Sequence, residues 1–438
     1  MAREMKDSGI EWIDSIPKSW KTMKIKYSSW LKGRIGWQGL TASEYVDEGP
    51  YLVTGTDFQN GKVDWSRCAH ITKERFEEDS DIHIKEGDLL ITKDGTVGKV
   101  AIAKDCPNEV SLNSGIMLIR NTGKYQYSDK YLYYVLLSDE FWRWYTLTQA
   151  GQSTIKHLYQ AQFYSFEYTY PSIKEQKAIA DFLDTKCASI DIVIEKTRAS
   201  IEEYKKLKRA IITQTVTKGF HPDRSMKDSG VDWIGDIPVE WEMTKVKYVA
   251  EFQPSCDSSN LTKDCEISYL PMEYIKNGYF INNTAKYSDV SSSLTPFNNG
   301  DIAIAKVTPC FENGNIAVME NLSSGFGLGS SELFILRPRS ILTKYLFYWL
   351  QNDSFMQRGC STMNGTGGLK RVSPYFMRNC PVTVPNDAEQ KEIVAYLDHK
   401  TNEIDALIEK KEMYLSGLES LKKSLIFEYV TGKKEVPA

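Results

Sequence analysis

The stretch Met5-Lys-Asp-Ser-Gly-Ile-Glu-Trp-Ile-Asp-Ser-Ile-Pro-Lys-Ser-Trp20 occurs a second time, later in the chain, as Met226-Lys-Asp-Ser-Gly-Val-Asp-Trp-Ile-Gly-Asp-Ile-Pro-Val-Glu-Trp241. Extended to Tyr27 and Tyr248, the two copies are identical at 13 of 23 positions. A match at one fixed offset is the signature of an internal repeat. The chain of 438 residues is therefore built from two copies of one unit. We call these two stretches the leading blocks.

A second pair of matching segments closes each copy. The segment Glu175–Arg198 returns as Glu389–Glu412, with 12 identities in 24 positions. We call this gap-free match of Glu175 with Glu389 the tail alignment. Between the leading block and the tail the similarity is much weaker. Divergence confined to the middle indicates that the two middles do different jobs of the same kind. Simple duplication with drift is the alternative, but drift alone would not favour the middle over both ends.

Composition limits the classes of protein. Hydrophobic residues make up 41% and charged residues 26%, which is ordinary for a soluble globular protein. No run of about 18 apolar residues exists, and the start of the chain is charged, so we expect a cytoplasmic protein without a membrane span. The eight cysteines are scattered without a C-x-x-C pair, which favours reduced thiols. A net charge of −4 argues against a lone, tight, non-specific binder of nucleic acid.

The two tails are predicted to be long helices. Ser172 with Glu175 and Asn386 with Glu389 have the spacing of a capping box. Gly219 and Gly432 follow the last periodic residues and are expected to end the helices. Each helix would have about 45 residues and a length of roughly 65 Å.

Apolar residues recur in these tails with heptad spacing, which favours a coiled-coil seam. The predicted seam residues of the first tail are Leu183, Ile190, Val193, Ile194, Thr197, Ile201, Tyr204, Leu207 and Ile211. Those of the second tail are Leu397, Ile404, Leu407, Ile408, Leu415, Leu418, Leu421 and Leu425. Neither helix can bury this stripe alone. We expect an intramolecular pair of helices, with a homodimer seam as the lesser alternative.

The two middles, about residues 25–170 and 246–385, are expected to be mixed α/β with prominent strands. Short β-rich runs are bounded by Gly, Pro and Asn in both. An aromatic amphipathic helix follows in each copy, and its aromatic residues are expected in the core rather than on a base-stacking surface. The predicted fold class is α+β, with segments 1–172, 173–222, 223–386 and 387–438 as head, long helix, head and long helix.

Enzyme signatures are not found. The sequence from Gly95 to Lys99 resembles a phosphate-binding loop, but the required first glycine would fall at Lys93. Gly325-Phe-Gly-Leu-Gly lacks a following dinucleotide-binding helix and is expected to be a turn. The five histidines lack metal-ligand spacing. We therefore expect a chain with no catalytic residue and no metal site.

Polar, glycine-rich loops carry the chemistry that remains. Arginine and lysine donate to guanine, asparagine and glutamine pair with adenine, and glycines allow the backbone to approach closely. Such loops occur in equivalent places of both copies, which favours DNA contact over solvated turns. The candidate residues are Arg34, Trp37, Gln38, Lys93, Thr96, Lys99, Gln152, Lys156, His157, Lys306, Thr308, Asn364, Thr366, Lys370 and Arg371.

The order of variable domain, long helix, variable domain, long helix resembles the specificity subunit of type I restriction–modification enzymes. The tail Pro-x-x-x-Glu-Gln-Lys-x-Ile-x-x-x-Leu-Asp and the leading block Ser-Gly-x-x-Trp-Ile-x-x-Ile-Pro-x-x-Trp, each present twice, resemble the repeated regions of that family. The resemblance covers essentially the whole chain. One departure is that the second helix ends Val430-Thr-Gly432, one residue shorter than Val216-Thr-Lys-Gly219.

The resemblance implies two target-recognition domains, each recognising one half of a bipartite sequence in double-stranded DNA. It implies antiparallel helices in a pseudo-two-fold arrangement, which set the spacer between the half-sites and leave the two chain ends close together. Two modification subunits carrying S-adenosylmethionine would dock along them. Restriction subunits using ATP and magnesium would join, so every cofactor belongs to a partner. The alternatives are a coiled-coil adaptor with two protein-binding heads and a stand-alone two-headed DNA-binding regulator.

Overall fold

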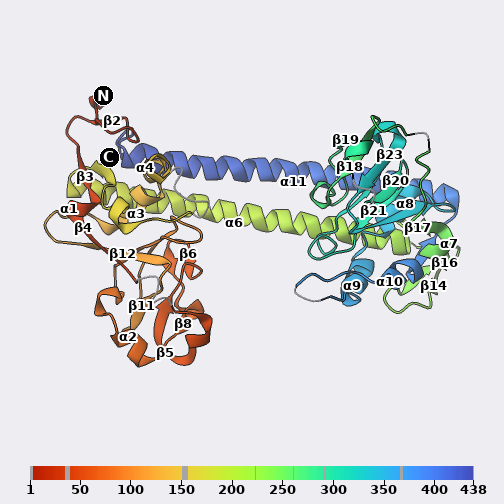
Figure 1. The fold of residues 1–438 in the computed structure, drawn as a ribbon, viewed down its shortest axis with the longest axis horizontal. Helices are drawn as coiled ribbons and strands as arrows, with labels where there is room; N and C mark the ends of the chain where they lie inside the picture. Colours follow the sequence, from red (N-terminus) through yellow and green to blue (C-terminus); the bar gives the residue numbers. More distant parts are fainter. Residues whose placement is uncertain are drawn as a thin grey trace. The chain divides into compact units, whose positions relative to one another are not determined.

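The computed structural model describes residues 3–34, 40–149, 156–221, 223–259, 261–290, 293–365 and 368–437 (Figure 1). Contacts divide the chain into two compact units. Unit 1 comprises Met1–Thr197 with Met413–Ala438, and unit 2 comprises Arg198–Glu412. Each unit holds one head, which is a leading block with its middle, and part of each long helix. The predicted α+β class with two repeated heads and two long helices is confirmed.

The described part of unit 1 contains two main sheets and two short ladders. The larger sheet has the order β4 (Ser29–Gly33), β12 (Ile116–Asn121), β9 (Leu89–Thr92), β10 (Val100–Ile102), β7 (Lys62–Val63), β6 (Phe58–Gln59). The smaller sheet has the order β11 (Val110–Leu112), β5 (Val46–Val53), β8 (Ala69–His70). The ladders pair β1 (Met5–Asp7) with β2 (Ser15–Pro17) and β13 (Glu167–Tyr170) with β3 (Lys21–Lys24). The helices of the head are α1 (Ile25–Ser28), α2 (Lys73–Glu77), α3 (Asp129–Leu137), α4 (Asp139–Gln149) and α5 (Gln160–Phe163).

Unit 2 repeats this plan, with one further strand among the described residues of its second sheet. Its described strands form one sheet in the order β17 (Ala250–Phe252), β24 (Leu333–Pro338), β21 (Ile302–Ala305), β22 (Ile316–Val318), which matches β4-β12-β9-β10. The second sheet has the order β19 (Thr284–Lys286), β18 (Glu266–Leu270), β23 (Phe326–Gly329), β20 (Thr295–Asn298). The ladders pair β14 (Met226–Asp228) with β15 (Asp236–Pro238) and β16 (Glu242–Lys245) with β25 (Pro381–Val384). The helices are α7 (Val246–Val249), α8 (Thr343–Trp349), α9 (Asp353–Ser361) and α10 (Pro374–Asn379).

The central strands are apolar throughout because both faces of the sheet are covered. In β9, Leu89 and Ile91 face the core that contains the helices, whereas Leu90 faces a second core shared with the smaller sheet. Strand β21 repeats this alternation, with Ile302 on one side and Ala303 on the other. Side chains of successive residues point to opposite faces of a strand, so a continuous apolar run indicates burial on both. The aromatic residues of α3 and α8 lie in the core, as predicted.

The long helices are α6 (Ile173–Lys218) and α11 (Asp387–Val430). The capping box of α6 is present, since Glu175 N donates to Ser172 Oγ and Ser172 N donates to the Glu175 carboxylate, each over 3.3 Å. In α11, Glu389 N donates to Asn386 Oδ1 over 3.0 Å. Gly219 and Gly432 follow the helix ends with φ of +73° and +70°, the left-handed conformation that glycine adopts most easily.

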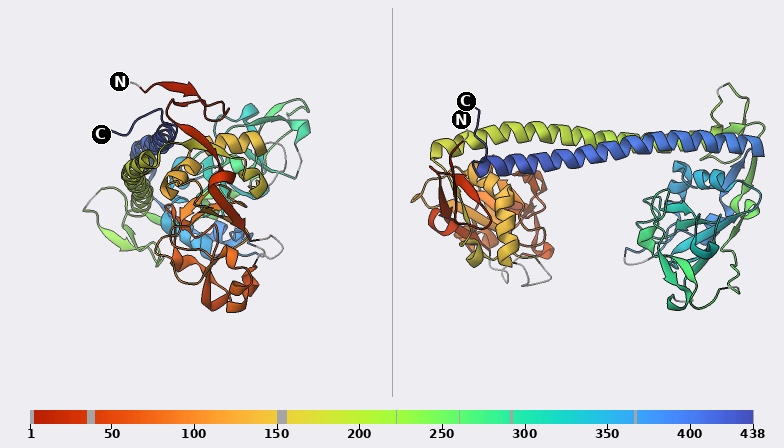
Figure 2. Two further views of the ribbon diagram at one scale, coloured as in Figure 1. Left: turned by 90° about the vertical axis from the view of Figure 1, so that its left-hand side faces the viewer. Right: turned by 90° about the horizontal axis from the view of Figure 1, so that it is seen from above.

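Within each unit, the parts of helices α6 and α11 that belong to it lie side by side and antiparallel (Figures 1 and 2). In unit 1, Lys422 Nζ donates to Asp191 Oδ1 over 2.6 Å. In unit 2, Lys208 Nζ donates to Asp405 Oδ2 over 2.7 Å. The tail alignment matches Asp191 with Asp405 and, continued along the helices, Lys208 with Lys422, so the two units repeat the same interhelical contact. This packing confirms an intramolecular pair of helices.

Most of the predicted seam residues are buried or half-buried along these helices. They are Leu183, Ile190, Ile194, Thr197, Ile201, Tyr204, Ile211, Leu397, Ile404, Ile408, Leu415, Leu418 and Leu425. The prediction was wrong for four others, which are exposed: Val193, Leu207, Leu407 and Leu421. Each of the four directly precedes a position on the seam. In a heptad repeat only two positions face the partner helix, and two such positions are taken by Lys208 and Lys422. Their apolar stems pack along the seam while their ammonium groups reach aspartates.

Each head also holds the last turn of one long helix. In unit 1, the carbonyl oxygen of Val430 accepts hydrogen bonds from Tyr131 Oη over 2.9 Å and Thr169 Oγ1 over 2.7 Å. In unit 2, the carbonyl oxygen of Val216 accepts from Tyr345 Oη over 3.3 Å and Thr383 Oγ1 over 2.7 Å. The last carbonyl groups of a helix have no partner within it, so these buried hydroxyl groups attach the helix end to the head.

Each leading block contacts the start of a long helix: the first contacts the start of α6, and the second contacts the start of α11. Trp20 Nε1 donates to Glu175 over 3.2 Å, and Trp241 Nε1 donates to Glu389 over 2.9 Å. Arg3 and Arg224 pair with the same two carboxylates. Burial would raise the pKa of Glu175, but hydrogen bonds from Trp20, Ser172 and Arg3 hold it below its usual value. Arg3 also lies 3.7 Å from Glu435, so residues near the two chain ends contact each other, as the resemblance implied.

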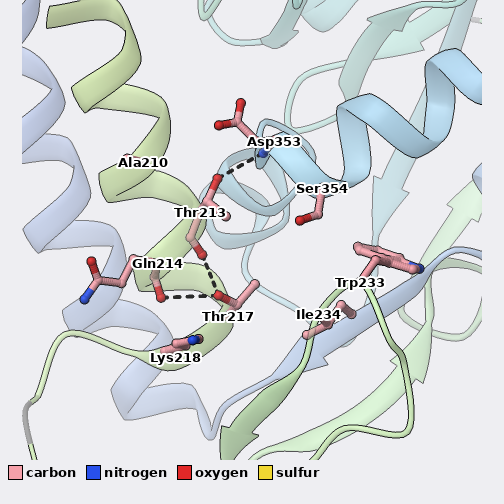
Figure 3. A pocket seen from close by; sticks show the side chains of 9 residues that line it. All are labelled: Ala210, Thr213, Gln214, Thr217, Lys218, Trp233, Ile234, Asp353 and Ser354. Carbon is pink, nitrogen blue, oxygen red and sulfur yellow. Dashed lines mark hydrogen bonds between the residues drawn. The ribbon is translucent and has the colours of Figure 1, made fainter. Parts of the chain in front are cut away.

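The place where the head holds the helix end differs between the two units at a buried position. Glu140 is fully buried in unit 1, where Thr169 N donates to its carboxyl group over 2.8 Å. Thr169 Oγ1 has a single hydrogen, which it donates to the Val430 carbonyl oxygen. The second carboxyl oxygen of Glu140 lies 3.2 Å from Thr169 Oγ1. This geometry fits a protonated Glu140 that donates a hydrogen bond to the threonine hydroxyl. In unit 2 the equivalent residue is Ser354, which lines a cavity of about 470 Å³ between α6 and α9 (Figure 3).

Burial raises the pKa of the Glu140 carboxyl to about 8, from 4.5 when it is exposed. The stability from keeping it protonated is fully present below about pH 4.5 and is lost as the pH rises through about 8. Glu140→Gln removes this dependence because the amide stays neutral. We expect the variant to match the wild type within about 1 kcal/mol at pH 5, and to be the more stable protein at pH 9, measured by thermal unfolding. Parallel loss of stability in both proteins would contradict a protonated Glu140.

Candidate nucleic-acid interface

Two of the predicted loops of unit 1 meet at the end of strand β9. The turn between β9 and β10 contains Lys93, Thr96 and Lys99, and the later loop contains Lys156 and His157. Leu158 N donates to the Lys93 carbonyl oxygen over 2.8 Å, which joins the two loops. Segments that are distant along the chain therefore present one continuous polar surface.

Local backbone geometry explains the shape of the first loop. Gly95 and Gly98 have φ of +67° and +85°, which residues with a Cβ adopt at a cost. A Cβ at Gly98 would also lie 2.5 Å from the ring of Trp142, so glycine is needed for this close approach. Thr92 Oγ1 donates to the Thr96 carbonyl oxygen over 2.6 Å and accepts from Lys99 N over 2.9 Å. These contacts hold the exposed Thr96 and Lys99 side chains at the outside of the turn.

The charges of this surface are positive apart from one carboxylate. Asp94 pairs with His157, whose ring lies 4.2 Å from that of the exposed Tyr159. Lys99 and Lys156 are exposed, and neither forms an ion pair with any residue that the structure describes. Their ammonium groups remain free for an anion.

The equivalent loops of unit 2 also meet. Val372 N donates to the Lys306 carbonyl oxygen over 2.8 Å, which is the counterpart of the contact between Leu158 and Lys93. Thr308 Oγ1 donates to the Gly368 carbonyl oxygen over 3.0 Å and accepts from Lys370 N over 3.0 Å. Thr308 therefore holds the two loops together, and its hydroxyl hydrogen is already used.

Some of the predicted cationic side chains of unit 2 bind protein acceptors, and others are free. Arg371 Nη2 donates to Glu332 over 2.6 Å, and this contact holds the pKa of Glu332 below its usual value. Lys306 Nζ donates to the Ser331 carbonyl oxygen over 2.7 Å. Lys370 is exposed and has no ion-pair partner among the described residues, and Asn364 is exposed beside it. Lys370 is thus the most available predicted cation of this unit, whereas Asn364 Nδ2 already donates to the Thr362 carbonyl oxygen over 3.2 Å.

Arg34 does not belong to this surface. Its side chain is only 2% exposed, and it donates to the Leu112 carbonyl oxygen and to Ser111 Oγ, both over 3.2 Å. Burial lowers the pKa of its guanidinium. The prediction was wrong for Arg34, because a buried guanidinium with protein acceptors cannot reach DNA. Trp37, Gln38, Gln152 and Thr366 lie outside the described residues.

Sequence reasoning overlooked a pocket that adjoins the loops of unit 2. It includes Arg358 on α9 and Asn379 on α10. Neither residue stands in a glycine-rich loop, so the criterion used for the other candidates did not select them. The tail alignment, continued towards the start of the chain, places Arg358 opposite Trp144. A comparison of the two copies could therefore have selected this arginine.

Metal-ligand clusters, disulfides and membrane-spanning helices were sought among the described residues. The described residues include no group of three or more His, Cys, Asp or Glu side chains that could hold a metal ion. All eight cysteines are free. No helix of the described chain is both long and apolar enough to cross a membrane.

Comparisons with known proteins agree with this architecture. The family model described as type I restriction modification DNA specificity domain matches residues 39–203 and 238–414. The EcoAI specificity subunit of Escherichia coli is 36% identical over 196 residues, which cover 44% of this chain and 33% of that protein. The MjaVIII specificity subunit of Methanocaldococcus jannaschii is 25% identical and covers 96% of this chain and 94% of its own. The chain thus spans about a third of the length of the EcoAI subunit but nearly all of the archaeal one.

A solved structure shares the fold along the chain. It comes from a type I restriction–modification system, has a TM-score of 0.68 at 14% identity, and covers 96% of this chain and 99% of its own. At this identity the likeness shows the fold alone. The family model, however, matches both copies of the repeat, and each match includes a pair of meeting polar loops and the first part of a long helix. The chain therefore belongs to the family of type I restriction–modification specificity subunits.

Proposed function

We propose that this chain selects the DNA target of a type I restriction–modification complex and that each head recognises one half of a bipartite sequence. The observation that carries the proposal is the meeting of equivalent polar loops in both heads, joined by Leu158–Lys93 in one and Val372–Lys306 in the other. The loops occupy the same place in the repeat and carry different residues. Two equivalent surfaces with different side chains suit two different half-sites.

Free cations and one exposed amide give these surfaces the chemistry for DNA. Lys99, Lys156 and Lys370 offer ammonium groups to phosphates or to guanine, and Asn364 can pair with adenine. The ion pair between Arg371 and Glu332 can open when a phosphate or base edge replaces the carboxylate. We assign Lys99 and Lys156 to the first half-site and Lys370 to the second.

The long helices would set the spacer between the half-sites. Helix α6 passes from unit 1 to unit 2 without a break, and its 46 residues correspond to about 69 Å. A continuous helix paired with a second one resists bending. Its number of residues would then fix the separation of the two recognition surfaces.

The chemical steps would belong to partners. Two modification subunits with S-adenosylmethionine would dock along the helices, and restriction subunits with ATP and magnesium would complete the complex. Exposed apolar side chains on the helices, such as Ile192, Leu207 and Met413, are available for docking. This chain would act as a non-catalytic subunit in the cytoplasm.

Sequencing of methylated bases tests the proposal as a whole. Cells that express this chain with a modification subunit should carry adenine methylation at one asymmetric sequence of two specific parts and a non-specific spacer. Copurification of the two subunits should accompany it. Absence of both would contradict the proposal and would favour an adaptor, whereas tight DNA binding by the chain alone would favour a regulator.

Lys370→Ala should relax the second half-site and leave the first unchanged. A lost base contact costs roughly 1–3 kcal/mol of discrimination at that position. The measurement is the affinity of the complex for duplexes with single base changes across the target. Lys263→Ala, which removes an exposed lysine outside the loops of the same unit, is the control. If both variants retain full discrimination, Lys370 does not contact a base.

A further inference from the structure

A second cavity of unit 2, of about 480 Å³, opens beside the recognition loop of residues 364–372. Helix α9 contributes Arg358, the residue Thr362 follows that helix, and helix α10 contributes Tyr375 and Asn379. Asn364 lines the cavity and also belongs to the loop, where it exchanges backbone hydrogen bonds of 3.0 and 2.9 Å with Arg371. The cavity and the loop therefore form one continuous surface.

The electrostatics of this cavity suit an anion. None of the described residues that line it is acidic. Arg358 is exposed, and no residue that the structure describes forms an ion pair with it. Lys247 Nζ donates to Asn379 Oδ1 over 2.9 Å, which places a second positive charge next to the lining. A guanidinium without a carboxylate partner keeps its donors for a ligand, and its fork matches the oxygen atoms of a phosphate.

The same position of unit 1 is filled by aromatic side chains. In the tail alignment, continued towards the start of the chain, Trp144 stands where unit 2 has Arg358, and Phe166 stands where unit 2 has Cys380. Trp144 and Phe166 are fully buried, with ring centroids 5.0 Å apart. Exchange of a tryptophan for an arginine and of a phenylalanine for a cysteine removes apolar volume and adds a charge. At these two aligned positions the described residues of unit 1 therefore offer neither the charge nor the space that unit 2 has.

We propose that this cavity binds a backbone phosphate of the DNA strand that the loop of residues 364–372 contacts. The proposal rests on the proposed function and adds an anchoring site that the first head lacks. Arg358 supplies the charge, and Asn364 keeps one amide hydrogen for the anion because its Nδ2 gives the other to the Thr362 carbonyl oxygen over 3.2 Å. Tyr375, which is 76% exposed, stands at the rim. A phosphate contact positions a protein on DNA without sequence information. The site should therefore raise affinity for every sequence equally.

Arg358→Ala in the complex of this chain with its modification subunit tests the site. The affinity for the methylated target sequence is measured from 50 to about 200 mM salt, a range in which phosphate contacts dominate the change. The slope of log affinity against log salt should decrease by about 0.9 to 1. Affinities for cognate and singly mismatched duplexes should fall by the same factor. Arg358→Lys should restore most of the slope because it retains the charge.

Arg339→Ala is the matched control, because Arg339 is an exposed arginine of the same head that pairs with Glu251 and does not line the cavity. It should leave the slope unchanged. An unchanged slope in Arg358→Ala, with thermal stability equal to the wild type, would overturn the phosphate site while the proposed function stands. Inorganic phosphate is added to the wild type and to Arg358→Ala in a second measurement. If it raises the thermal stability of the wild type alone while Arg358→Ala leaves the salt slope unchanged, the pocket binds free phosphate and the proposal is wrong. A wild-type complex without sequence preference would refute the proposed function, and the phosphate site with it.

Discussion

The structure depends on a constraint of the two long helices, whose apolar seams can be buried only against each other. Isolated helices with a heptad stripe expose that stripe to water, so pairing is required for stability. Each pairing is completed by a head, which holds the carbonyl group of Val216 or Val430 with a tyrosine and a threonine. The two units repeat these contacts at equivalent positions. Heads, helices and leading blocks are thus parts of one repeated design.

Within this design the two units differ in their polar loops and around α4 and α9. The scaffold sheet is shared, and the order β8-β5-β11 of the second sheet in unit 1 returns in unit 2 as β19-β18-β23, to which the described strands of unit 2 add β20. The polar loops meet in both heads through equivalent backbone hydrogen bonds but carry Lys156 and His157 in one and Lys370 and Arg371 in the other. Arg358 lines a cavity in unit 2, whereas Trp144, which stands at the same position of the tail alignment, is buried in unit 1. Under the proposed function, these differences would serve the recognition of two different half-sites.

Sequence periodicity predicted the repeat, the helix ends and most of the seam, because these features follow from local spacing. It was wrong for Val193, Leu207, Leu407 and Leu421, since apolar character alone does not separate a seam position from its neighbour. Lys208 and Lys422 were overlooked because their place on the seam depends on aspartates of the other helix. Arg34 was misassigned, since its partners at Ser111 and Leu112 come from a distant strand. Charge and loop composition could not reveal contacts that only the folded chain creates.

A change in helix length tests most directly the claim that two heads held by paired helices recognise two half-sites at a fixed separation. The variant repeats Asp191–Thr197 once in α6 and Ala406–Glu412 once in α11, so that one heptad is added to each helix and the seam is preserved. One heptad adds about 10 Å, which spans about three base pairs. Methylation sequencing should show both half-sites unchanged and a spacer longer by about that amount. The same insertion in α6 alone breaks the register and should lower stability. An unchanged spacer in the doubly extended protein would contradict the account.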